Sequence, residues 1–193
     1  MNKNIILCGV GGQGTILASR LIATAAMNKD IPIKTAETIG MAQRGGSVFS
    51  HLRLGEGTNS PLIGKKEVDL IIGFEPGETV RQLPFLKPGG TVVVSRRPVM
   101  PVSAMIGQSS YNASEMLEYL KANVENLVIV DADKAAEDLG SAQTLNVVLL
   151  GAALQSGELG LDEEDLIGAI KEKVPEKYFA LNQKALAWSR EQE

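Results

Sequence analysis

Residues 4–14 read Asn-Ile-Ile-Leu-Cys-Gly-Val-Gly-Gly-Gln-Gly, and this stretch decides the fold. After the first residue the run stays apolar as far as Val10, without alternation, which is typical of a parallel strand buried on both faces. Glycines follow at once, and residues 15–28 then carry apolar side chains at helical spacing along one stripe. The order strand, glycine turn, helix predicts the first unit of an α/β domain.

Strand patterns alternate with helical patterns along the rest of the chain. We expect strands at 31–37, 48–54, 68–74, 91–95 and 127–130, and helices beginning at 75 and 162 and covering 114–123, 134–139, 142–154 and 176–190. Residues 68–95 predict a βαβ unit. The alternation predicts one three-layer α/β/α domain with a mainly parallel sheet, spanning residues 1–193.

Length and cysteine content limit the class of protein. A chain of 193 residues with 44% apolar and 22% charged residues has the composition of a globular domain. At this size roughly 70% of the unfolded surface can be buried, so neither disulfides nor metals are needed for stability. Cys8 is the only cysteine. A lone cysteine excludes an intrachain disulfide, a CxxC pair, a four-cysteine zinc site and a self-contained iron–sulfur cluster.

Charge and hydropathy limit the partners. With 19 Lys and Arg against 23 Asp and Glu, the formal net charge is −4, and no stretch concentrates the basic residues. A phosphate backbone requires such a concentration, so we expect no nucleic-acid partner. The apolar run at 5–10 is too short for a signal peptide, and Val147–Leu154 is far below the roughly 20 residues that span a bilayer. We therefore expect a cytoplasmic protein with no membrane partner.

The glycines at 9–14 fit the pattern G-x-G-x-x-G between a strand and a helix, which is the context that this fingerprint requires. We expect Gly9 to form the tight turn, Gly11 to allow close backbone approach and Gly14 to permit helix packing. Free amides and the dipole of the following helix favour an anion there. Gly9, Gly11, Gly12, Gln13 and Gly14 are therefore candidate ligand-binding residues, although a turn that only reverses the chain would use the same glycines.

Two nucleotide-binding alternatives depend on neighbouring residues. Glu37, near the end of the second expected strand, could bind ribose hydroxyls, so an NAD(P) cofactor stays open. The phosphate loop of nucleotide triphosphatases needs Lys and then Ser or Thr where this chain has Thr15 and Ile16. Since no lysine would reach the β and γ phosphates, a triphosphatase is disfavoured.

A second glycine-rich motif, Gly-Met-Ala-Gln-Arg-Gly-Gly-Ser-Val, covers residues 40–48. Gly45 and Gly46 free the backbone, and the amides there could form an anion-binding nest beside the guanidinium of Arg44. Arg44, Gly45, Gly46 and Ser47 therefore join the candidate binding residues. A glycine-rich entry to a strand with an exposed arginine would explain the same pattern.

The other reactive side chains have simple structural explanations. His51 is the only histidine, and its place on an alternating strand makes it most simply a surface or interface residue. Cys8 lies inside the first strand, as a buried small hydrophobe would. Glu75 and Glu78 follow a strand end, where they could act as acids, anchor a hydroxyl or cap a helix. We assign no catalytic residue and no metal site.

Four motifs in this order resemble those of one family. They are Gly9-Val-Gly-Gly-Gln-Gly14, Met41-Ala-Gln-Arg-Gly-Gly-Ser-Val48 with Ser50-His-Leu-Arg53, Asp69-Leu-Ile-Ile-Gly-Phe-Glu-Pro76 and Leu86-Lys-Pro-Gly-Gly90. Together they resemble the gamma-type subunits of 2-oxoacid:ferredoxin oxidoreductases. The Met-Ala-Gln-Arg-Gly-Gly version is most similar to that of the small (beta) subunits of indolepyruvate ferredoxin oxidoreductases. The resemblance is strong over residues 5–95 and weaker beyond, where it rests on Asn146, Gly151 and a helical tail.

The resemblance implies a subunit that is inactive alone. Such complexes decarboxylate a 2-oxoacid on thiamine diphosphate, pass electrons through iron–sulfur clusters to ferredoxin and release an acyl-CoA. This chain has no Gly-Asp-Gly thiamine motif and only one cysteine, so we expect both cofactors in a larger partner subunit. The roles left for this chain are assembly of the complex and a share in CoA binding. In that role, the 9–14 turn and Arg44 would bind the CoA phosphates. An NAD(P)-dependent dehydrogenase and a stand-alone binding module stay open as alternatives.

The segment 41–53 is the expected contact with that larger subunit. Its glycine-rich loop carries methionine, glutamine and arginine, and Phe49, His51 and Arg53 share one face of the strand that follows. Such a mixture of apolar, aromatic and basic side chains is typical of interfaces.

Overall fold

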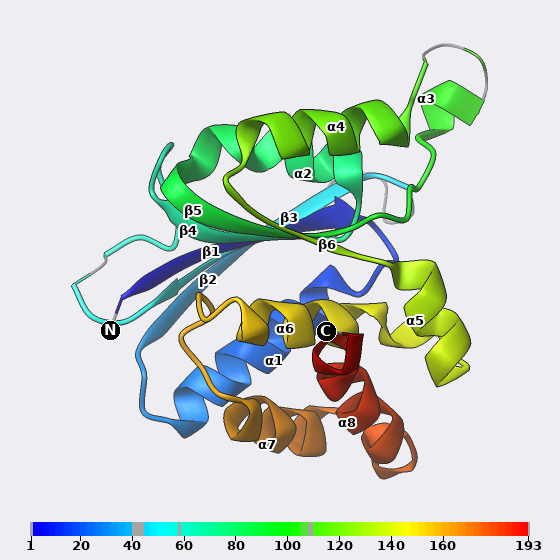
Figure 1. The fold of residues 1–193 in the computed structure, drawn as a ribbon. Coiled ribbons are helices and arrows are strands. Elements are labelled where there is room, and N and C mark those ends of the chain that lie inside the picture. Colours follow the sequence, from blue (N-terminus) through cyan, green and yellow to red (C-terminus); the bar gives the residue numbers. More distant parts are fainter. Residues whose placement is uncertain (1, 40–44, 58, 106, 108–109, 193) are drawn as a thin grey trace.

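A computed structural model describes residues 2–39, 45–57, 59–105, 107 and 110–192. Its centre is a six-stranded sheet in the order β2-β3-β1-β4-β5-β6 (Figure 1). The strands are β1 (Lys3–Val10), β2 (Ile33–Ile39), β3 (Ser47–Leu54), β4 (Val68–Gly73), β5 (Leu86–Ser95) and β6 (Asn126–Val130). Only β3 runs against its neighbours, so the mainly parallel sheet predicted from the sequence is confirmed.

The helices follow the predicted order, with one short helix, α3 (Val102–Met105), that was not predicted. They are α1 (Thr15–Asn28), α2 (Pro76–Gln82), α3 (Val102–Met105), α4 (Ala113–Asn123), α5 (Ala132–Leu139), α6 (Leu145–Gln155), α7 (Glu163–Lys173) and α8 (Phe179–Trp188). Short 3-10 turns lie at Leu83–Phe85 (η1), Ala142–Thr144 (η2), Glu176–Tyr178 (η3) and Ser189–Gln192 (η4). The helix predicted from residue 162 begins there because Asp162 and Asp165 form a reciprocal capping box.

The βαβ unit predicted at 68–95 is present as β4, α2 and β5. One boundary differs, because β5 begins at Leu86 rather than Thr91. Leu86 pairs with Val68, and the next paired residues are Leu70 and Thr91, so the pairing register shifts between them. The Pro-Gly-Gly run therefore lies inside the strand, in this irregular stretch, rather than ending the unit.

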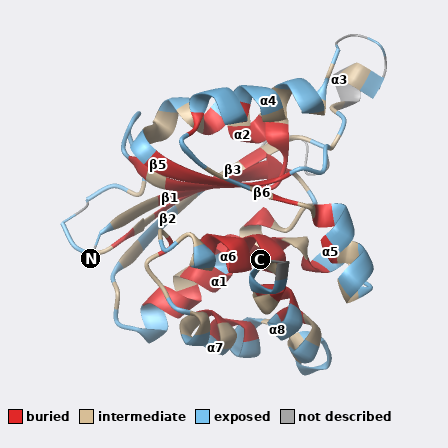
Figure 2. Ribbon diagram, viewed as in Figure 1, coloured by how far each residue is buried: buried red, intermediate tan, exposed pale blue. Residues whose placement is uncertain are grey.

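Helices cover the two faces of the sheet unequally (Figure 1). On one side, which we call the thick face, α1 and α6 lie on the sheet while α7 and α8 pack outside them. On the other side, the thin face, α2, η1 and α4 are the cover. Buried residues are concentrated in the sheet, α1 and α6, and α4 is largely exposed (Figure 2). This arrangement confirms the predicted three layers and adds outer helices on one side.

The helices of the thick face approach one another closely. An ideal Cβ built at Gly151 of α6 would lie 2.1 Å from the carbonyl oxygen of Leu186 in α8. Glycine is therefore required at this contact. At the other end of the layer, Lys29 Nζ lies 2.7 Å from carboxylate oxygens of both Asp162 and Asp165, which ties the end of α1 to the start of α7.

Strand β3 is buried on both faces, which corrects the reading of His51 as a surface or interface residue. The ring of His51 lies 5.6 Å from that of Phe49 and 5.9 Å from that of Phe85. Its Nδ1 accepts a hydrogen bond of 3.1 Å from the Ile63 amide. The loop after β3 and the turn η1 thus cover the side chain, and burial lowers the pKa of His51.

Arg53, on the same strand face, is also engaged within the chain. Its guanidinium donates to Asn4 Oδ1 and to the Leu62 carbonyl oxygen, at 3.1 Å in each case. Residues 41–44 of the expected interface segment lie outside the described residues. This strand face therefore no longer supports the expected contact with a larger subunit, because His51 and Arg53 make their contacts within the chain itself.

Candidate functional site

The centre of the sheet contains a topological switch point. Strands β1 and β4 are parallel neighbours, yet the chain leaves β1 for α1 on the thick face and leaves β4 for α2 on the thin face. The two loops therefore diverge beyond the carboxyl ends of the strands. In open α/β sheets, this crevice is where ligands bind.

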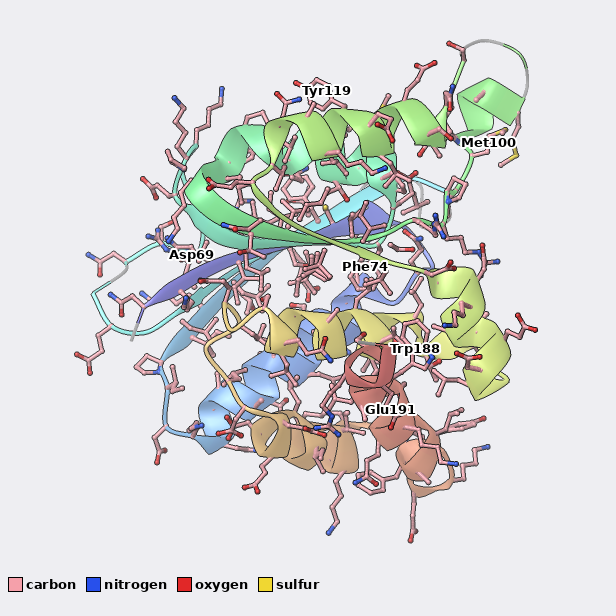
Figure 3. All side chains as sticks on the ribbon, viewed as in Figure 1. Asp69, Phe74, Met100, Tyr119, Trp188 and Glu191 are labelled. Carbon is pink, nitrogen blue, oxygen red and sulfur yellow. The ribbon has the colours of Figure 1, made fainter. Side chains whose placement is uncertain are left out.

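The glycine turn after β1 is locked to the end of β4. Gln13 Oε1 accepts from the Val10 amide at 2.7 Å, and Gln13 Nε2 donates to the Phe74 carbonyl oxygen at 2.9 Å. A Cβ at Gly9 would lie 2.7 Å from that of Phe74, so Gly9 permits close packing rather than forming the turn. Figure 3 shows Phe74 between the sheet and the thick-face helices. Gln13 thus supports the turn, and its side chain is committed to backbone groups.

The amides of the turn are only partly available. The Gly11 amide donates to the Gly46 carbonyl oxygen at 2.8 Å, because the pairing of β1 with β3 continues past the strand ends. The expectation that Gly11 offers its amide to a ligand is therefore wrong, although the same bond brings the two glycine motifs together. Gly12 and Gly14 have no such partner among the described residues. Gly14, with φ of 84°, caps the 14-residue helix α1.

An open pocket of about 720 Å³ lies beside this turn. Gly12 and Gly14 form one side, the loop Arg97–Met100 after β5 forms another, and Asn146 at the start of α6 forms part of a third. Asn146 is 3% exposed, and its Oδ1 has no hydrogen-bond partner in the described part of the chain. A buried carbonyl oxygen without a donor is costly, so a ligand hydroxyl or amide would satisfy it.

Arg97 supplies the positive charge that lines this pocket. Its side chain is about half exposed, and its Nε lies 3.5 Å from Asp133 Oδ1, so water and one carboxylate screen it. Sequence reasoning missed both Arg97 and the buried, unsatisfied acceptor of Asn146. The pair Arg96-Arg97 directly after a strand could have indicated a cation at the site. The carboxyl ends of parallel strands lie together at one end of the sheet, so residues that follow one strand lie near those that follow its neighbours.

The second motif is only partly described. Arg44 lies outside the described residues, so its predicted role stays a prediction. Gly45 has φ of 79°, a left-handed conformation that suits glycine. Ser47 Oγ donates to Glu78 Oε2 at 2.6 Å, so this hydroxyl is committed to the start of α2. The described part of the motif therefore lies beside the turn without lining the pocket.

The two acids at the start of α2 have structural partners. Glu75 caps the helix by accepting from the Glu78 amide at 2.8 Å, and it also accepts from the Tyr111 hydroxyl. Glu75 is 2% exposed, and burial raises the pKa of its carboxyl. Of the three roles considered, helix capping is confirmed for Glu75. The hydroxyls that the two acids accept from belong to the chain itself, Tyr111 for Glu75 and Ser47 for Glu78.

Glu37 does not lie where a dinucleotide would need it. It is exposed on β2, in register with Ser50 of β3 and hence with Leu7 of β1. Since β3 separates β2 from β1, Glu37 is two strand spacings, or roughly 10 Å, to the side of β1. The ribose-binding role considered for Glu37 is therefore wrong.

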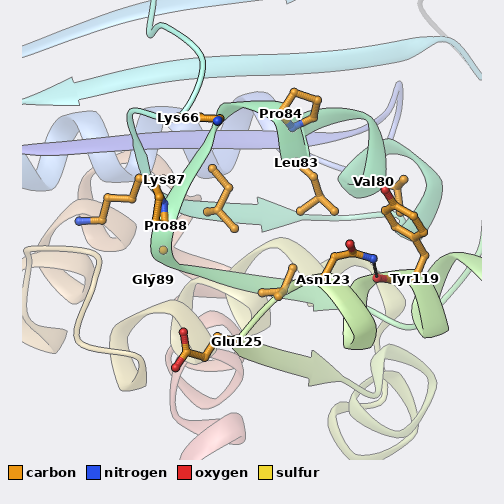
Figure 4. Close-up of a pocket in the computed structure, with 13 residues that line it drawn as sticks. Lys66, Val80, Leu83, Pro84, Lys87, Pro88, Gly89, Tyr119, Asn123 and Glu125 are labelled. Carbon is orange, nitrogen blue, oxygen red and sulfur yellow. Dashed lines mark hydrogen bonds between the residues drawn. The ribbon is translucent and has the colours of Figure 1, made fainter.

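A second pocket, of about 510 Å³, lies at the end of the sheet that is opposite the switch point (Figure 4). Leu83 and Tyr119 contribute apolar surface, and Lys66 and Lys87 lie at one end. Lys87 Nζ is 2.5 Å from Asp69 Oδ1, so part of this charge is neutralised. The pocket is at the amino ends of the parallel strands, away from the switch point, and we do not assign the main ligand to it.

Neither a metal centre nor a membrane span is found in the described part of the chain. No three His, Cys, Asp or Glu side chains there come together as ligands, and no helix there is long and apolar enough to cross a bilayer. Cys8 is fully buried in β1, as predicted, and burial raises its pKa strongly. A single buried thiol cannot hold an iron–sulfur cluster.

Fold and pocket together define an α/β domain with an open pocket beside the switch point of its sheet. The sequence pattern of the pyruvate ferredoxin/flavodoxin oxidoreductase family matches residues 4–191. The chain therefore belongs to this family, and the resemblance to gamma-type subunits of oxoacid ferredoxin oxidoreductases is confirmed.

The comparisons place the chain among small subunits of oxidoreductase complexes. It is 36% identical over 187 residues to the indolepyruvate oxidoreductase subunit IorB of Thermococcus kodakarensis, covering 94% of this chain and 91% of that protein. The gamma subunit of a keto/oxoacid ferredoxin oxidoreductase from Geobacter sulfurreducens has the same fold, with a TM-score of 0.71, 23% identity and coverage of 98% and 97%.

A longer chain contains the same fold. The 2-oxoglutarate:ferredoxin oxidoreductase of Magnetococcus marinus, solved with 2-oxoglutarate, coenzyme A and succinyl-CoA bound, matches with a TM-score of 0.73 and 19% identity. The match covers 98% of this chain and 30% of that one.

Proposed function

We propose that this chain is the small subunit of an indolepyruvate-type 2-oxoacid:ferredoxin oxidoreductase and that it binds part of CoA in the pocket beside Gly12 and Gly14. The 36% identity to a subunit named for indolepyruvate favours this member of the family. The presence of CoA in the structure of the longer Magnetococcus relative favours CoA as the ligand.

One observation carries the proposal: at the pocket, free amides and a cation lie near a buried acceptor. Gly12 and Gly14 amides at the start of α1, with Arg97 from the facing loop, suit a phosphate. Asn146 Oδ1 suits a hydroxyl or amide N–H. CoA carries phosphates, hydroxyls and amides in one molecule, so it can satisfy all of these groups.

The larger partner subunit is proposed to hold thiamine diphosphate and the iron–sulfur clusters and to reduce ferredoxin. A single cysteine, buried in β1, leaves this chain without cluster ligands. The isolated chain is then colourless and inactive. Iron analysis and 2-oxoacid-dependent dye reduction test this directly, and stoichiometric iron–sulfur absorbance in the isolated chain would overturn it.

The CoA site is tested by two neighbouring arginines in the assembled complex. Arg97 lines the pocket, whereas Arg96 is paired with Asp131 at 2.6 Å and does not line it. Arg97→Gln should raise the KM for CoA about tenfold, because a charged contact to phosphate contributes about 1.4 kcal/mol at this partly exposed position. Arg96→Gln should leave it within about twofold. Equal KM values in the two variants would refute CoA binding at this pocket.

The NAD(P) alternative has a separate test. A dehydrogenase would bind the dinucleotide at the same glycine turn, but the position of Glu37 removes the expected ribose contact. We expect titration calorimetry of the chain with NAD(H) and NADP(H) to show no binding. Micromolar affinity for either would replace the CoA proposal.

A further inference from the structure

We propose that the pocket beside Gly12 and Gly14 takes the phosphopantoyl part of CoA rather than its adenosine part, and that Asn146 selects it by accepting a hydrogen bond from the pantoyl hydroxyl. The inference rests on the proposed function and deepens it, because it names which half of CoA this chain binds. The phosphopantoyl part carries a phosphate, two methyl groups and a hydroxyl on one short stretch of carbon chain. The adenosine part carries a flat base, a ribose and phosphates.

The phosphate end is set by two helix starts that face the same pocket. The helices α1 and α6 contact each other on the thick face (Figure 1), and Gly14 at the start of one and Asn146 at the start of the other line the pocket. Neither helix has a side-chain hydrogen bond at its N-cap. Arg97 also lines the pocket, and none of the described lining residues is acidic. The two positive helix ends and the guanidinium therefore favour an anion here.

Much of the remaining lining is aliphatic. The start of each helix and the loop after β5 contribute this surface, through Leu17, Leu145, Pro98, Val99 and Met100. The two methyl groups of the pantoyl part gain from burial against such side chains. An adenine base commonly stacks on an aromatic ring, and a ribose hydroxyl commonly pairs with an acid. The described lining residues include neither an aromatic nor an acidic side chain, so the lining favours the pantoyl part.

The contacts of Asn146 among the described residues leave its polar end unexplained. It is 3% exposed, and α6 continues with the buried aliphatic residues 147–150. Its Nδ2 packs against the glycine turn, since a Cβ at Gly14 would lie 3.2 Å from that nitrogen. Its Oδ1 has no donor in the part of the chain that the structure describes. A leucine has nearly the same shape and would avoid the cost of an unpaired acceptor, so a donor on the ligand explains the amide.

The pantoyl hydroxyl is a donor that lies close to a phosphate. Along CoA the order is phosphate, the carbon with two methyl groups, hydroxyl and amide. In the pocket, Asn146 packs against Gly14 at the start of α1, where the phosphate is expected. Phosphate oxygens that carry no proton cannot donate to Oδ1, so the hydroxyl must do so. The adenosine part also has a hydroxyl beside a phosphate, and the aliphatic lining decides between the two.

The test compares two halves of CoA as inhibitors of the assembled complex. S-methyl phosphopantetheine is the pantoyl half with its thiol blocked, and adenosine bisphosphate, with its phosphates placed as in CoA, is the other half. Asn146→Leu should raise the inhibition constant of S-methyl phosphopantetheine and the KM for CoA about two- to tenfold, the range of one hydrogen bond. The inhibition constant of adenosine bisphosphate should change by less than about twofold. An equal rise for both halves, or no rise for S-methyl phosphopantetheine, would overturn the inference.

A second measurement separates ligand binding from a structural role. In the ligand-free chain, Asn146→Leu should raise the melting temperature, because it removes a buried acceptor that has no donor. Asn182→Leu is the matched control. Asn182 is buried in α8, but its Nδ2 donates to the Tyr178 carbonyl oxygen at 2.9 Å, and it does not line the pocket. This control should lower the melting temperature and leave both inhibition constants unchanged. A lower melting temperature for Asn146→Leu would assign Asn146 to the fold and overturn its role in selection.

The outcomes separate this inference from the proposed function. If Arg97→Gln leaves the KM for CoA unchanged, the CoA site itself is wrong. If Arg97→Gln raises that KM while Asn146→Leu weakens adenosine bisphosphate instead, the CoA site stands and the choice of the pantoyl half is overturned. Asn146→Ala, which removes the amide without adding bulk, is the second variant and should give the same difference between the two halves. A folded Asn146→Ala complex with unchanged inhibition by S-methyl phosphopantetheine would also overturn the inference.

Discussion

The two faces of the sheet are built for different purposes. On the thick face, two layers of helices enclose a core of aliphatic side chains, and backbones touch at Gly151. The buried titratable groups among the described residues all lie on the thin side. They are Cys8, His51, Glu75 and Glu78. Most of the apolar packing therefore lies on one face, while the other accommodates the buried titratable groups near the switch-point loops.

The largest expected effect comes from two neighbouring isoleucines of β4. Ile72 packs on the thick face and Ile71 on the thin face, and both are fully buried. Ile72→Ala should lower the free energy of unfolding by about 4 kcal/mol and Ile71→Ala by about 2 kcal/mol, because α2 and α4 can settle into the gap more easily. Urea denaturation of both variants measures the difference. Equal losses of unfolding free energy would mean that the helices on both faces close around the missing side chain to the same extent.

A pair of helical glycines sharpens the same comparison. Gly151→Ala places a methyl group against the Leu186 carbonyl oxygen, so α6 and α8 must separate, at a cost of about 2 kcal/mol. Gly168→Ala in α7 is the control, because nothing lies within 4 Å of its added Cβ. It should stabilise the protein by about 0.5 to 1 kcal/mol through helix propensity alone. Thermal melts should show a lower melting temperature for Gly151→Ala and a higher one for Gly168→Ala. A stabilising Gly151→Ala would contradict the close contact.

The smallest expected effect is the pH dependence contributed by His51. Burial lowers the folded-state pKa of His51, and a proton on Nδ1 would face the Ile63 amide. As pH falls from about 6.5 toward the folded pKa, the unfolded chain takes up the proton first, so this contribution to stability is lost. The slope is at most about 1.4 kcal/mol per pH unit.

The single histidine makes this measurement direct. Its ring signals in proton NMR should titrate below pH 6.5 in the folded protein, and denaturation at pH 5 and pH 8 should give the lower stability at pH 5. His51→Gln should reduce the pH dependence in that window. A histidine that titrates at or above pH 6.5 would place the ring in water rather than beneath the loop.

Local sequence signals were sufficient for most of the elements. The apolar run ending at Val10, the proline after Glu75 and the pair Asp162 and Asp165 act over a few residues, and each element begins or ends as predicted. Burial of β3 was missed because Ile63 and Phe85, which cover His51, come from later segments. An alternating pattern cannot reveal a cover that is remote in sequence.

The site was predictable only in part, for the same reason. The glycine turn is visible in the sequence, and Gly12 and Gly14 do line a pocket. The engagement of the Gly11 amide depends on β3 pairing beside β1, and the arrival of Arg97 depends on the order of β1, β4 and β5. Periodicity and spacing do not give strand order, so neither feature could be read before the structure was known.

The long sequence separation between the sheet and the later helices of its thick face has a consequence for synthesis. The four central strands are complete once β5 ends at Ser95, but α6 and α8 end only at Gln155 and Trp188. At roughly 5 to 20 residues per second, a ribosome leaves part of this aliphatic sheet surface bare for on the order of ten seconds. During that interval, the bare surface is exposed to contact with other nascent chains. A fragment that stops before α6 would keep this surface exposed permanently and would aggregate.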